Sequence, residues 1–489
     1  MASRTATALS APTRRELLAG AAACSVSASL TPSAAAEPTV LNDASGLNPT
    51  TVAAHWVAQP DLQAAYLARL RRELKDATVS RRPVAIGAAR HSMGGQSLAP
   101  HGTAITLDQG ICEVDRAGRT YRIMGGTRWR DVLTSLDPVG LSPKVMQSNH
   151  DFGVAASFSV NAHGWPAPQG PCGSTVRAID LMLADGTVVS CSRKENEELF
   201  RLAMGGYGLF GVVVAVELEA VANLALTPAF ETMRAESLGE RFAEHVRRRD
   251  GLNMGLGRLS VAREHFCREA ELVTFRPATD QTGPLPPLTS EGLLLAAAGR
   301  LYRAQIGSDL MKRVRWQAEI GLAPKLWPSR VTRNRLLNTP VSALAGRDLD
   351  RTDILHEYFV PPERFGAFCE ACREVIPPSR QELLNVTLRY VAEDPESLLA
   401  YAPTPRIGAV MAFSQRKRPQ DEARMRRMTE GLIDSVLALG GTYYLPYRLH
   451  ARPDQLGAAY PKFAPFCRLK RHYDPGLLFR NGLWNGYAV

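Results

Sequence analysis

Long apolar runs are missing from this 489-residue chain: no stretch of eighteen or more apolar residues occurs, so the sequence predicts no transmembrane helix. Internal repeats are missing too, as are low-complexity blocks beyond the first forty residues. The formal net charge is +10, but no nucleic-acid-binding signature accompanies the basic residues. We therefore interpret them as solvated helix faces with weak attraction to anionic surfaces, and expect no nucleic-acid partner.

A disulfide framework is also missing. Of eight cysteines, one lies in the N-terminal segment, and the remaining odd number is scattered along the chain. Cys369 and Cys372 form a CxxC pair, but no second pair supplies zinc ligands. Their spacing within 362–376 places both on one face of an amphipathic helix. We therefore predict core packing there and expect no metal site.

The first 36 residues are expected to be a signal peptide rather than part of the fold. They combine a basic start, a short apolar run and small residues at 34–36. Arg14 and Arg15 precede the apolar run as in a twin-arginine signal, for which a chance arginine pair is the alternative. This route exports folded proteins, so we expect a periplasmic or extracellular location. Removing the segment leaves a net charge near +8.

The rest is ordinary globular composition, 45% hydrophobic and 22% charged, at a length that suggests two or three domains. Residues 49–222 have the pattern of a β-rich α/β domain, and 223–450 that of an antiparallel sheet with helices. Residues 451–489 form a closing helix and tail. Strands are predicted at 83–87, 103–108, 212–220, 356–361, 383–394, 407–415 and 441–451, hairpins at 111–125 and 176–192, and helices at 127–136 and 194–204.

The stretch GYGLFG, residues 206–211, matches G-x-G-x-x-G, the fingerprint of dinucleotide binding. A Rossmann turn follows a strand and opens a helix, whereas here a helical pattern precedes the glycines and a strand follows them. The NAD interpretation therefore fails. The glycines instead make a tight entry into a strand, where backbone can approach a ligand.

A second glycine-rich stretch, 85–97, follows a predicted strand and has no helical pattern after it. Consecutive N–H groups in such a loop form a nest for an anion such as a pyrophosphate. His91 lies inside this loop, before a serine and two glycines. A third segment, 157–188, contains Asn161-Ala162-His163-Gly164 and a second run of small residues around Gly173. It too predicts close approach to a flat or charged group.

Taken in this order, the stretches GAARHSMGGQ, VNAHG, GPCGSTVRAIDLMLADG, ELFRLAMGGYGLFGVV and YDPGLLFRN resemble the vanillyl-alcohol-oxidase superfamily of flavoproteins. Within it, the chain is most similar to aldonolactone and sugar oxidases and to the decaprenylphosphoryl-ribose oxidases. The resemblance implies an α+β protein. Its parts would be a two-subdomain α/β FAD-binding domain of the PCMH type and an antiparallel-sheet cap, the substrate domain, covered by helices.

The resemblance also implies the cofactor and its contacts. FAD would be bound with its pyrophosphate in the 87–97 loop and its flavin linked covalently to His91. No cysteine precedes the His-Gly motif, so a second link is not expected. The remaining contacts to FAD would come from Gly87, Ala88, Ala89, Arg90, Ser92, Gly94, Gln96, Ser157, Asn161, His163, Gly164, Gly173, Ser174, Val176, Gly208, Gly211, Val212 and Asn481.

The catalytic groups are expected on cap strands that face the flavin. Within 383–394, Asn385, Thr387 and Arg389 share one face. The related ribose oxidases carry a lysine near Tyr447, which this chain lacks, so Tyr447 or His450 is the candidate base. Arg448 could bind an anion or carbonyl but is a poor base. His356 and Glu357 are the second choice for the base.

The predicted function is oxidation of a CH–OH group of a sugar, polyol or aldonolactone, with O2, a quinone or a redox protein as electron acceptor. The alternatives are an amine dehydrogenase of the cytokinin type, a flavin-binding protein without turnover, and a surface carbohydrate-binding protein. Ala162, where aldonolactone relatives carry a small residue that controls oxygen access, could favour dehydrogenase over oxidase behaviour. The basic segment 299–316 could make a weak peripheral membrane contact.

Overall fold

The computed structural model describes residues 39–58, 63–108, 110–286, 288, 292–341 and 348–488, so the predicted signal peptide lies outside the described residues. A small parallel sheet, in the order β3-β5-β4, begins the N-terminal domain. Helix α1 packs against it through Tyr66, Leu70, Leu74 and Ala77, whose spacing forms one apolar face. The elements are β1 (Thr39–Leu41), β2 (Thr50–Val52), β3 (Ala54–Ala58), α1 (Gln63–Val79), β4 (Val84–Gly87) and β5 (Thr103–Leu107).

An antiparallel sheet in the order β10-β9-β11-β7-β6 completes this domain, with β8 paired to the end of β11. Strand β11 lies between β9 and β7, and its valine-rich first half is buried on both faces. Both predicted hairpins, β6–β7 and β9–β10, are confirmed. The elements are β6 (Cys112–Asp115), β7 (Thr120–Met124), α2 (Trp129–Leu136), β8 (Leu141–Pro143), α3 (Val154–Ser159), β9 (Val176–Met182), β10 (Val188–Ser192), α4 (Glu197–Ala203) and β11 (Val212–Ala222).

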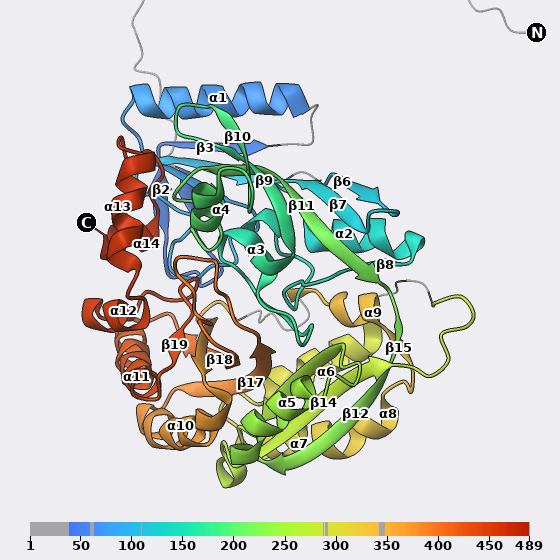
Figure 1. Cartoon of the computed structure of the whole chain (residues 1–489). Coiled ribbons are helices and arrows are strands. Elements are labelled where there is room, and N and C mark those ends of the chain that lie inside the picture. Colours follow the sequence, from blue (N-terminus) through green and yellow to red (C-terminus); the bar gives the residue numbers. More distant parts are fainter. Residues whose placement is uncertain are drawn as a thin grey trace, which may run out of the picture. The chain divides into compact units, whose positions relative to one another are not determined.

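The cap is built on an antiparallel sheet of order β15-β12-β14-β13-β17-β18-β16-β19 (Figure 1). Its strands are β12 (Ala225–Arg234), β13 (Met254–Leu259), β14 (Glu269–Pro277), β15 (Val331–Thr332), β16 (Arg351–Val360), β17 (Glu382–Val391), β18 (Arg406–Arg416) and β19 (Thr442–Tyr443). Its helices are α5 (Leu238–Arg247), α6 (Gly292–Ala304), α7 (Asp309–Gln317), α8 (Ala323–Leu326), α9 (Arg333–Leu337), α10 (Phe365–Ser379) and α11 (Pro419–Ala438).

Helices α5, α10 and α11 cover one face of the cap sheet. Cys369 and Cys372 of α10 are buried free thiols in the core that Val386 and Leu388 of β17 complete, which confirms the predicted amphipathic helix. The intervening residues of β17 project to the opposite face, where Asn385, Thr387 and Arg389 are only half-buried. The cap sheet therefore turns one apolar face to α5, α10 and α11, and its polar residues lie on the opposite face.

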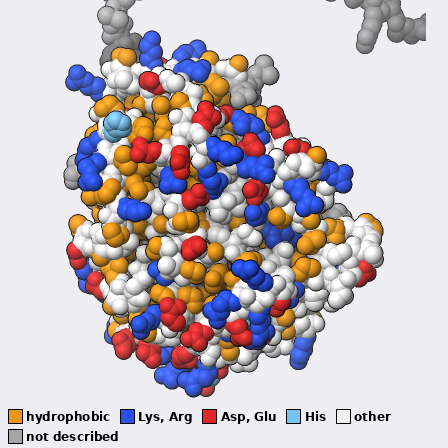
Figure 2. All heavy atoms as spheres, in the orientation of Figure 1, with side chains coloured by type: hydrophobic (Ala, Val, Ile, Leu, Met, Phe, Trp, Pro, Cys, Tyr) orange, Lys and Arg blue, Asp and Glu red, His pale blue; other side chains and the backbone are white. Residues whose placement is uncertain are grey.

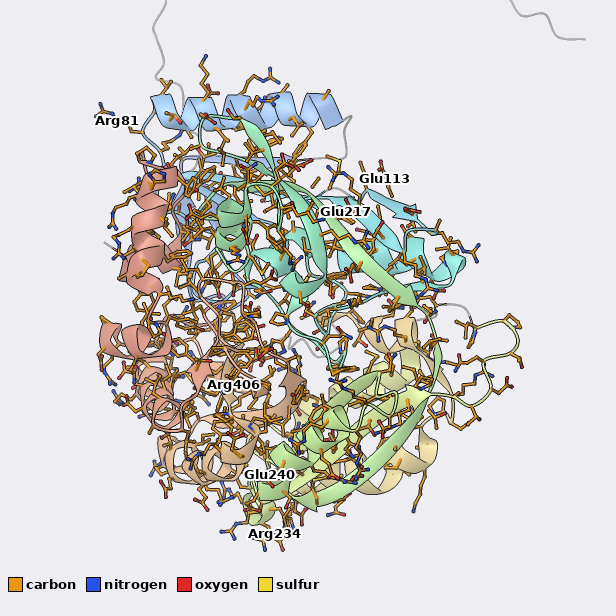
Figure 3. All side chains as sticks on the ribbon, viewed as in Figure 1. Arg81, Glu113, Glu217, Arg234, Glu240 and Arg406 are labelled. Atoms are coloured by element: carbon orange, nitrogen blue, oxygen red, sulfur yellow. The ribbon has the colours of Figure 1, made fainter. Side chains whose placement is uncertain are left out.

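The C-terminal segment returns to the N-terminal domain through α12 (Pro453–Ala459), α13 (Phe463–Tyr473) and α14 (Gly482–Tyr487). The N–H of Val84 in β4 donates to the carbonyl of Leu478 (2.7 Å), and the N–H of Arg480 donates to that of Val84 (3.0 Å). The predicted α+β fold, a FAD-domain-like pair of sheets beside an antiparallel cap, is confirmed. Figure 3 shows Glu113 and Glu217 on the N-terminal sheet and Arg234, Glu240 and Arg406 on the cap.

Two local predictions were wrong. The predicted strand at 441–451 ends after Tyr443, because Pro446 cannot donate to a ladder and the chain turns there. The strand-type alternation assumed for Tyr447, Arg448 and His450 is therefore absent. The capping-box spacing of Ser192 and Glu195 predicts a cap for the helix at 194–204, but the Ser192 Oγ accepts from the N–H groups of residues 194 and 195, and the N-cap position of α4 is Asn196.

Charged side chains of both signs are interspersed on the surface, as expected for solvated helix faces (Figure 2). On the face shown in Figure 2, Lys and Arg side chains alternate with Asp and Glu. Among the helices of the described residues, none is long and apolar enough to cross a membrane. In the same residues, no group of three or more His, Cys, Asp and Glu side chains could hold a metal ion.

Candidate functional site

The loop after β4 presents five consecutive free N–H groups. Among the described residues, no hydrogen-bond acceptor serves the N–H groups of 88–92, which include Ala88, Ala89, Arg90, His91 and Ser92. The N–H groups of the next three residues, Met93 to Gly95, donate to acceptors within the protein. The anion nest is therefore shorter than predicted and ends at Ser92. Those three bonds run from Met93 to Pro446 O, from Gly94 to Gln96 Oε1 and from Gly95 to Asp43 Oδ2, each 2.8 Å long.

Two arginines make this loop electropositive. Arg90, at φ 51°, has a buried Nε atom without a hydrogen-bond partner. The buried Nη1 atom of Arg128, at the start of α2, also lacks a partner. Burial and the charge of Arg128 lower the pKa of Arg90. Their one carboxylate partner among the described residues is Asp108, 3.0 Å from Arg128 and half exposed. Since buried donors are normally satisfied, the loop and both arginines fit a group of high negative charge such as a pyrophosphate.

His91 lies beside this nest and stacks on Phe152, with ring centroids 4.1 Å apart. Burial lowers the pKa of His91, the Asp151 carboxylate opposes that shift, and the Arg128 charge adds to it. The imidazole is therefore mainly neutral at pH 7, which is the form that can act as a nucleophile.

The C-terminal segment and the GYGLFG turn close around the same loop. The side-chain amide of Asn481 donates to Tyr207 O (2.8 Å), and the N–H of Gly482 donates to Gly95 O (2.8 Å). Gly208 and Gly211 both have positive φ, 70° and 155°, which an L side chain rarely adopts. A helix precedes this turn and β11 follows it, as predicted, and Val212 is fully buried at the start of β11.

Several predicted flavin contacts have their polar groups occupied by the protein itself. Ser157 Oγ accepts from Trp129 Nε1 and donates to Gly153 O, both at 2.9 Å. Asn161 accepts from the N–H of Gly173 (2.9 Å) and donates to Asp394 (2.8 Å). These two side chains hold the 157–188 segment to α2 and to the cap, so their own direct contact with a ligand is not supported by the geometry.

The small residues of these segments also serve internal packing. A Cβ at Gly164 would lie 1.9 Å from Met146 O, and one at Gly173 would lie 2.4 Å from Met204 Sδ. The predicted close approach therefore involves protein atoms at both positions. Ser174 donates to Pro171 O (2.7 Å) with an exposed side chain, and Val176 is fully buried in the core. Neither is placed for a flavin contact by its side chain.

A cluster of polar groups forms where His163 of the N-terminal domain meets the polar face of the cap sheet. The Nε2 of His163 lies 2.6 Å from Oε1 of Glu357 in β16, and both side chains are almost fully buried. Tyr447 donates from its hydroxyl to Oε2 of the same carboxylate (3.4 Å), and Arg389 donates to the carbonyl of His163 (3.4 Å). The cluster thus combines a carboxylate, a phenol, an imidazole and a guanidinium.

Beyond the His163–Glu357 pair, this cluster contains two buried polar atoms that the described part of the protein leaves without hydrogen-bond partners: His163 Nδ1 and Arg389 Nε. Burial and the neighbouring Glu357 carboxylate raise the pKa of Tyr447 well above 10, which keeps its hydroxyl protonated. Rings of Phe359, Tyr401 and Tyr444 surround the imidazole of His163 at centroid distances of 5.3, 5.7 and 6.0 Å. The arrangement fits a flat ring system and a hydroxyl-bearing substrate that supply the missing partners.

The other predicted catalytic residues lie elsewhere. His450 and His356 face α11 behind the cap sheet, where His450 Nε2 contacts Glu422 (2.7 Å) and both rings contact Thr429. Arg448 is held by Glu422 and by the carbonyl of Met93 (3.0 Å). Burial lowers the pKa of both histidines. Because the 441–451 segment turns at Pro446 instead of continuing as a strand, the prediction of His450 or Arg448 at the active site was wrong.

Asn385 does share a face with Arg389, but its side chain is engaged. Its Oδ1 accepts from Arg258 (2.9 Å) and Arg315 (2.9 Å), whose charges Glu319 balances. Glu271 lies in the same cluster with Oε1 unpartnered, and burial together with the Glu319 charge raises its pKa to about 7. Asn385 therefore organises a charged network on this face. Sequence reasoning missed Arg128, whose only signal was its position at the predicted start of a helix. It also gave Glu357 only as the second choice for the base.

The structure has three parts that are typical of a FAD-binding flavoprotein. They are a parallel sheet with a glycine-rich anion loop, an antiparallel sheet beside it, and a cap that turns a polar face towards them. Residues 62–192 match the family described as FAD binding domain, so this segment is a FAD-binding domain of the PCMH type found in the vanillyl-alcohol-oxidase superfamily. The structure thus places the anion loop, His91, Arg128 and His163 within the matched domain.

Curated relatives resemble the same part of the chain. The chain is 34% identical over 148 residues to alditol oxidase of Streptomyces sp. (strain IKD472 / FERM P-14339), covering 30% of this chain and 34% of that protein. It is 32% identical over 159 residues to cytokinin dehydrogenase 7 of Oryza sativa subsp. japonica, covering 31% and 29%. For cytokinin dehydrogenase 1 of Arabidopsis thaliana the identity is 30% over 144 residues, covering 28% and 24%. The chain thus spans about a third or less of the length of these relatives.

Proposed function

We propose that the protein is an FAD-dependent oxidoreductase that oxidises a CH–OH group of a sugar, polyol or aldonolactone. The observation that carries the proposal is the cluster of Glu357, Tyr447, Arg389 and His163, which joins the cap to the FAD-binding domain and keeps unpartnered polar atoms. FAD, when bound, would supply a two-electron acceptor for the hydride of the carbon that carries the hydroxyl.

Each group of the cluster has a task suited to its charge. The Glu357 carboxylate accepts the proton of the substrate hydroxyl, as a general base within hydrogen-bond reach. Tyr447 stays protonated and orients this hydroxyl by donating to it or to Glu357. The Arg389 guanidinium stabilises the negative charge that develops on the substrate oxygen as the hydroxyl loses its proton. His163 aligns Glu357 from the opposite domain.

The loop 88–92, Arg90 and Arg128 would hold the pyrophosphate of FAD, and His91 would carry the covalent link. A neutral imidazole, as burial favours for His91, supports this role. The direct test is acid precipitation of the purified chain and of His91→Ala, followed by flavin fluorescence of the denatured protein band. Fluorescence in the wild type alone supports the link. Free flavin from both would place FAD in the same loop without a covalent bond.

The electron acceptor is proposed to be O2, a quinone or a redox protein. Ala162, which is buried between Ser157 and Cys172, is proposed to limit access of O2 to the flavin. The rate of flavin reoxidation in air tests this: Ala162→Gly should reoxidise faster, and an unchanged rate would exclude the role.

Export by the twin-arginine route to the periplasm or cell exterior, and a weak membrane contact, complete the proposal. Support for the contact comes from the exposed apolar residues of the described part of the chain, five of which gather between 310 and 327: Leu310, Val314, Leu322, Leu326 and Trp327. Arg313 and Lys325 are exposed among them.

An amine dehydrogenase of the cytokinin type is the second candidate, because cytokinin dehydrogenases match the same segment as the alditol oxidase. A panel of polyols, aldonolactones and N6-substituted adenines with a dye acceptor separates the two. Flavin that no candidate reduces would favour a flavin-binding protein without turnover. A chain that takes up no FAD at all would favour a carbohydrate-binding protein instead.

A further inference from the structure

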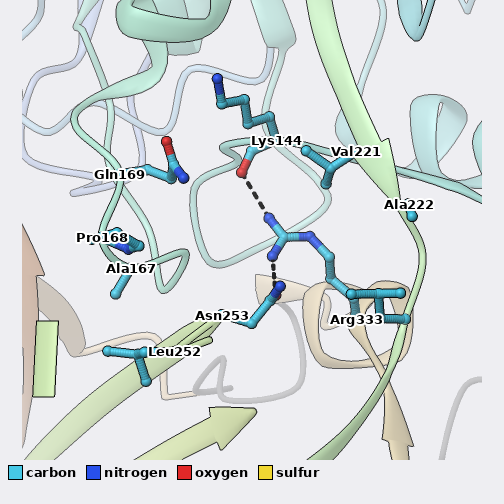
Figure 4. Close-up of a pocket in the computed structure, with 10 residues that line it drawn as sticks. Lys144, Ala167, Pro168, Gln169, Val221, Ala222, Leu252, Asn253 and Arg333 are labelled. Carbon is cyan, nitrogen blue, oxygen red and sulfur yellow. Dashed lines mark hydrogen bonds between the residues drawn. The ribbon is translucent and has the colours of Figure 1, made fainter. Parts of the chain in front are cut away.

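A cavity of about 130 Å³ lies away from the candidate active site, between the N-terminal domain and the cap (Figure 4). Strand β11 contributes Val221 and Ala222, and the loop within 157–188 contributes Gln169. The turn before β13 contributes Leu252 and Asn253. Pro168 is exposed and Lys144 is half-buried at its edge, so the cavity can be reached from solvent.

Arg333, the first residue of α9, lines this cavity and is 3% exposed. Four of its five N–H groups donate to uncharged acceptors. The fifth, on Nη1, has no acceptor among the described residues. The four bonds run from Nε to Ser142 Oγ (3.1 Å), from Nη1 to Asn253 Oδ1, and from Nη2 to Pro143 O (3.1 Å) and Lys144 O (2.7 Å).

The charge of Arg333 has no counter-ion in the described part of the chain: no carboxylate there lies within ion-pair distance. Lys144, at the edge of the cavity, has a carboxylate partner of its own in Glu219 at 2.7 Å. Burial alone lowers the pKa of Arg333 to about 10, still well above neutrality, so the side chain is a cation. A buried, unpaired charge is costly, and buried charges are normally paired.

The lining of the cavity indicates which anion would suit it. Its polar groups are the free Nη1 hydrogen of Arg333, the side-chain amides of Gln169 and Asn253, and Lys144, whose ammonium is paired with Glu219. The rest is apolar: Ala167, Pro168, Val221, Ala222, Leu224 and Leu252. A phosphate would need more donors than these to replace its hydration, whereas a carboxylate needs few, and its hydrocarbon part would contact the apolar wall.

We propose that this cavity is a binding site for a small aliphatic carboxylate, whose carboxylate group pairs with Arg333 and whose hydrocarbon part packs on Val221 and Leu252. The site is separate from the proposed flavin chemistry, and its position between the domains means that its occupation stabilises their contact.

The test uses the full chain loaded with FAD and two probes of similar size, sodium butyrate and neutral butyramide, at constant ionic strength. Saturating butyrate should raise the midpoint of thermal unfolding by about 2–4 °C, as expected for a ligand at about a hundred times its Kd. Butyramide should leave it unchanged. Calorimetric titration should show one butyrate per chain.

Two variants address the site. Arg333→Met removes the charge together with four internal hydrogen bonds, so Ala222→Leu, which fills the cavity while Arg333 and its bonds stay in place, is the second variant. Both should weaken butyrate binding at least tenfold, whereas Ala304→Leu, at an exposed position of α6, should bind as the wild type does. Equal effects of butyrate and butyramide, or butyrate binding that survives Ala222→Leu, would overturn the proposal. Stabilisation by inorganic phosphate but not by butyrate would overturn the choice of a carboxylate.

Discussion

Glu357 is the residue on which the proposed chemistry depends most. Replacing it with Gln keeps the size of the side chain but removes its ability to take a proton. We expect kcat with the best substrate of the panel to fall by about 10²–10⁴-fold, the usual range for a general base, while FAD content stays constant. Anaerobic reduction of the flavin, followed by stopped-flow absorbance, measures the step. Glu382→Gln, which affects a carboxylate paired with Lys312 at the start of β17, is the control. A similar loss in both variants would contradict the assignment.

Glu271 allows a residue-scale test by pH. Its pKa in the folded chain is raised to about 7, so the folded state binds more protons than the unfolded state between about pH 4.5 and 7. Its stabilising contribution is complete below that window and is lost as the pH rises through 7. Glu271→Gln removes this dependence. Relative to wild type, the variant should gain up to about 3 kcal/mol in unfolding free energy between pH 5 and pH 8. Denaturant unfolding at the two pH values measures it, and a constant difference would contradict the assigned pKa.

At the scale of elements, glycines divide into those that the fold requires and those it does not. Gly164 would bring a Cβ within 1.9 Å of Met146 O, a backbone atom that cannot move aside cheaply. We expect Gly164→Ala to lower the unfolding free energy by more than about 2 kcal/mol and to reduce FAD content, because the segment carries His163. Gly457, in α12, meets no atom within 4 Å, so Gly457→Ala should instead raise stability by about 0.4–1 kcal/mol. Thermal unfolding of both variants tests the contrast.

Elements were predictable where a local pattern decides them. The alternation of Asn385, Thr387 and Arg389 along β17 and the buried valines of β11 follow from the sequence because one period fixes both strand and face. The same reasoning was wrong for segment 441–451. Its polar residues alternate, but strand pairing stops before Pro446, and Arg448 and His450 contact Glu422 of α11 behind the sheet. The stretch 85–97 predicted for the anion does contain the free N–H groups of 88–92, but the end of that run at Met93 depends on Pro446 and Asp43, which lie far away in the sequence.

The candidate site was only partly predictable, because it is formed by contacts between domains. His163 was identified from its motif, yet its partner Glu357 is almost two hundred residues away and lies in a strand whose neighbouring residues look equally polar. No local signal distinguishes Glu357 from His356, which alternation directs to the opposite face of the sheet. Similarly, Arg128 gains its role from the spatial proximity of Arg90 and His91. Such pairings follow from the packing of whole domains rather than from spacing.

At the scale of the molecule, the exposed apolar residues of 310–327 support contact with a membrane surface. Leu310 and Val314 are four residues apart, and so are Leu322 and Leu326, so the members of each pair are neighbours on the helical surface. Basic residues outnumber acidic ones along it, which suits anionic lipids.

Vesicle sedimentation of the full chain tests this contact. Vesicles of phosphatidylcholine with phosphatidylglycerol should bind the protein, and vesicles of phosphatidylcholine alone should bind it several-fold less, with a loss in high salt because the electrostatic part is screened. The double variant Leu310→Ser/Leu326→Ser should lose most of the binding. Val79→Ser, at an equally exposed apolar position on α1, should bind as the wild type does. Equal binding by all three proteins would rule out this surface, and salt-independent self-association lost in the double variant would identify it as a contact between copies of the chain.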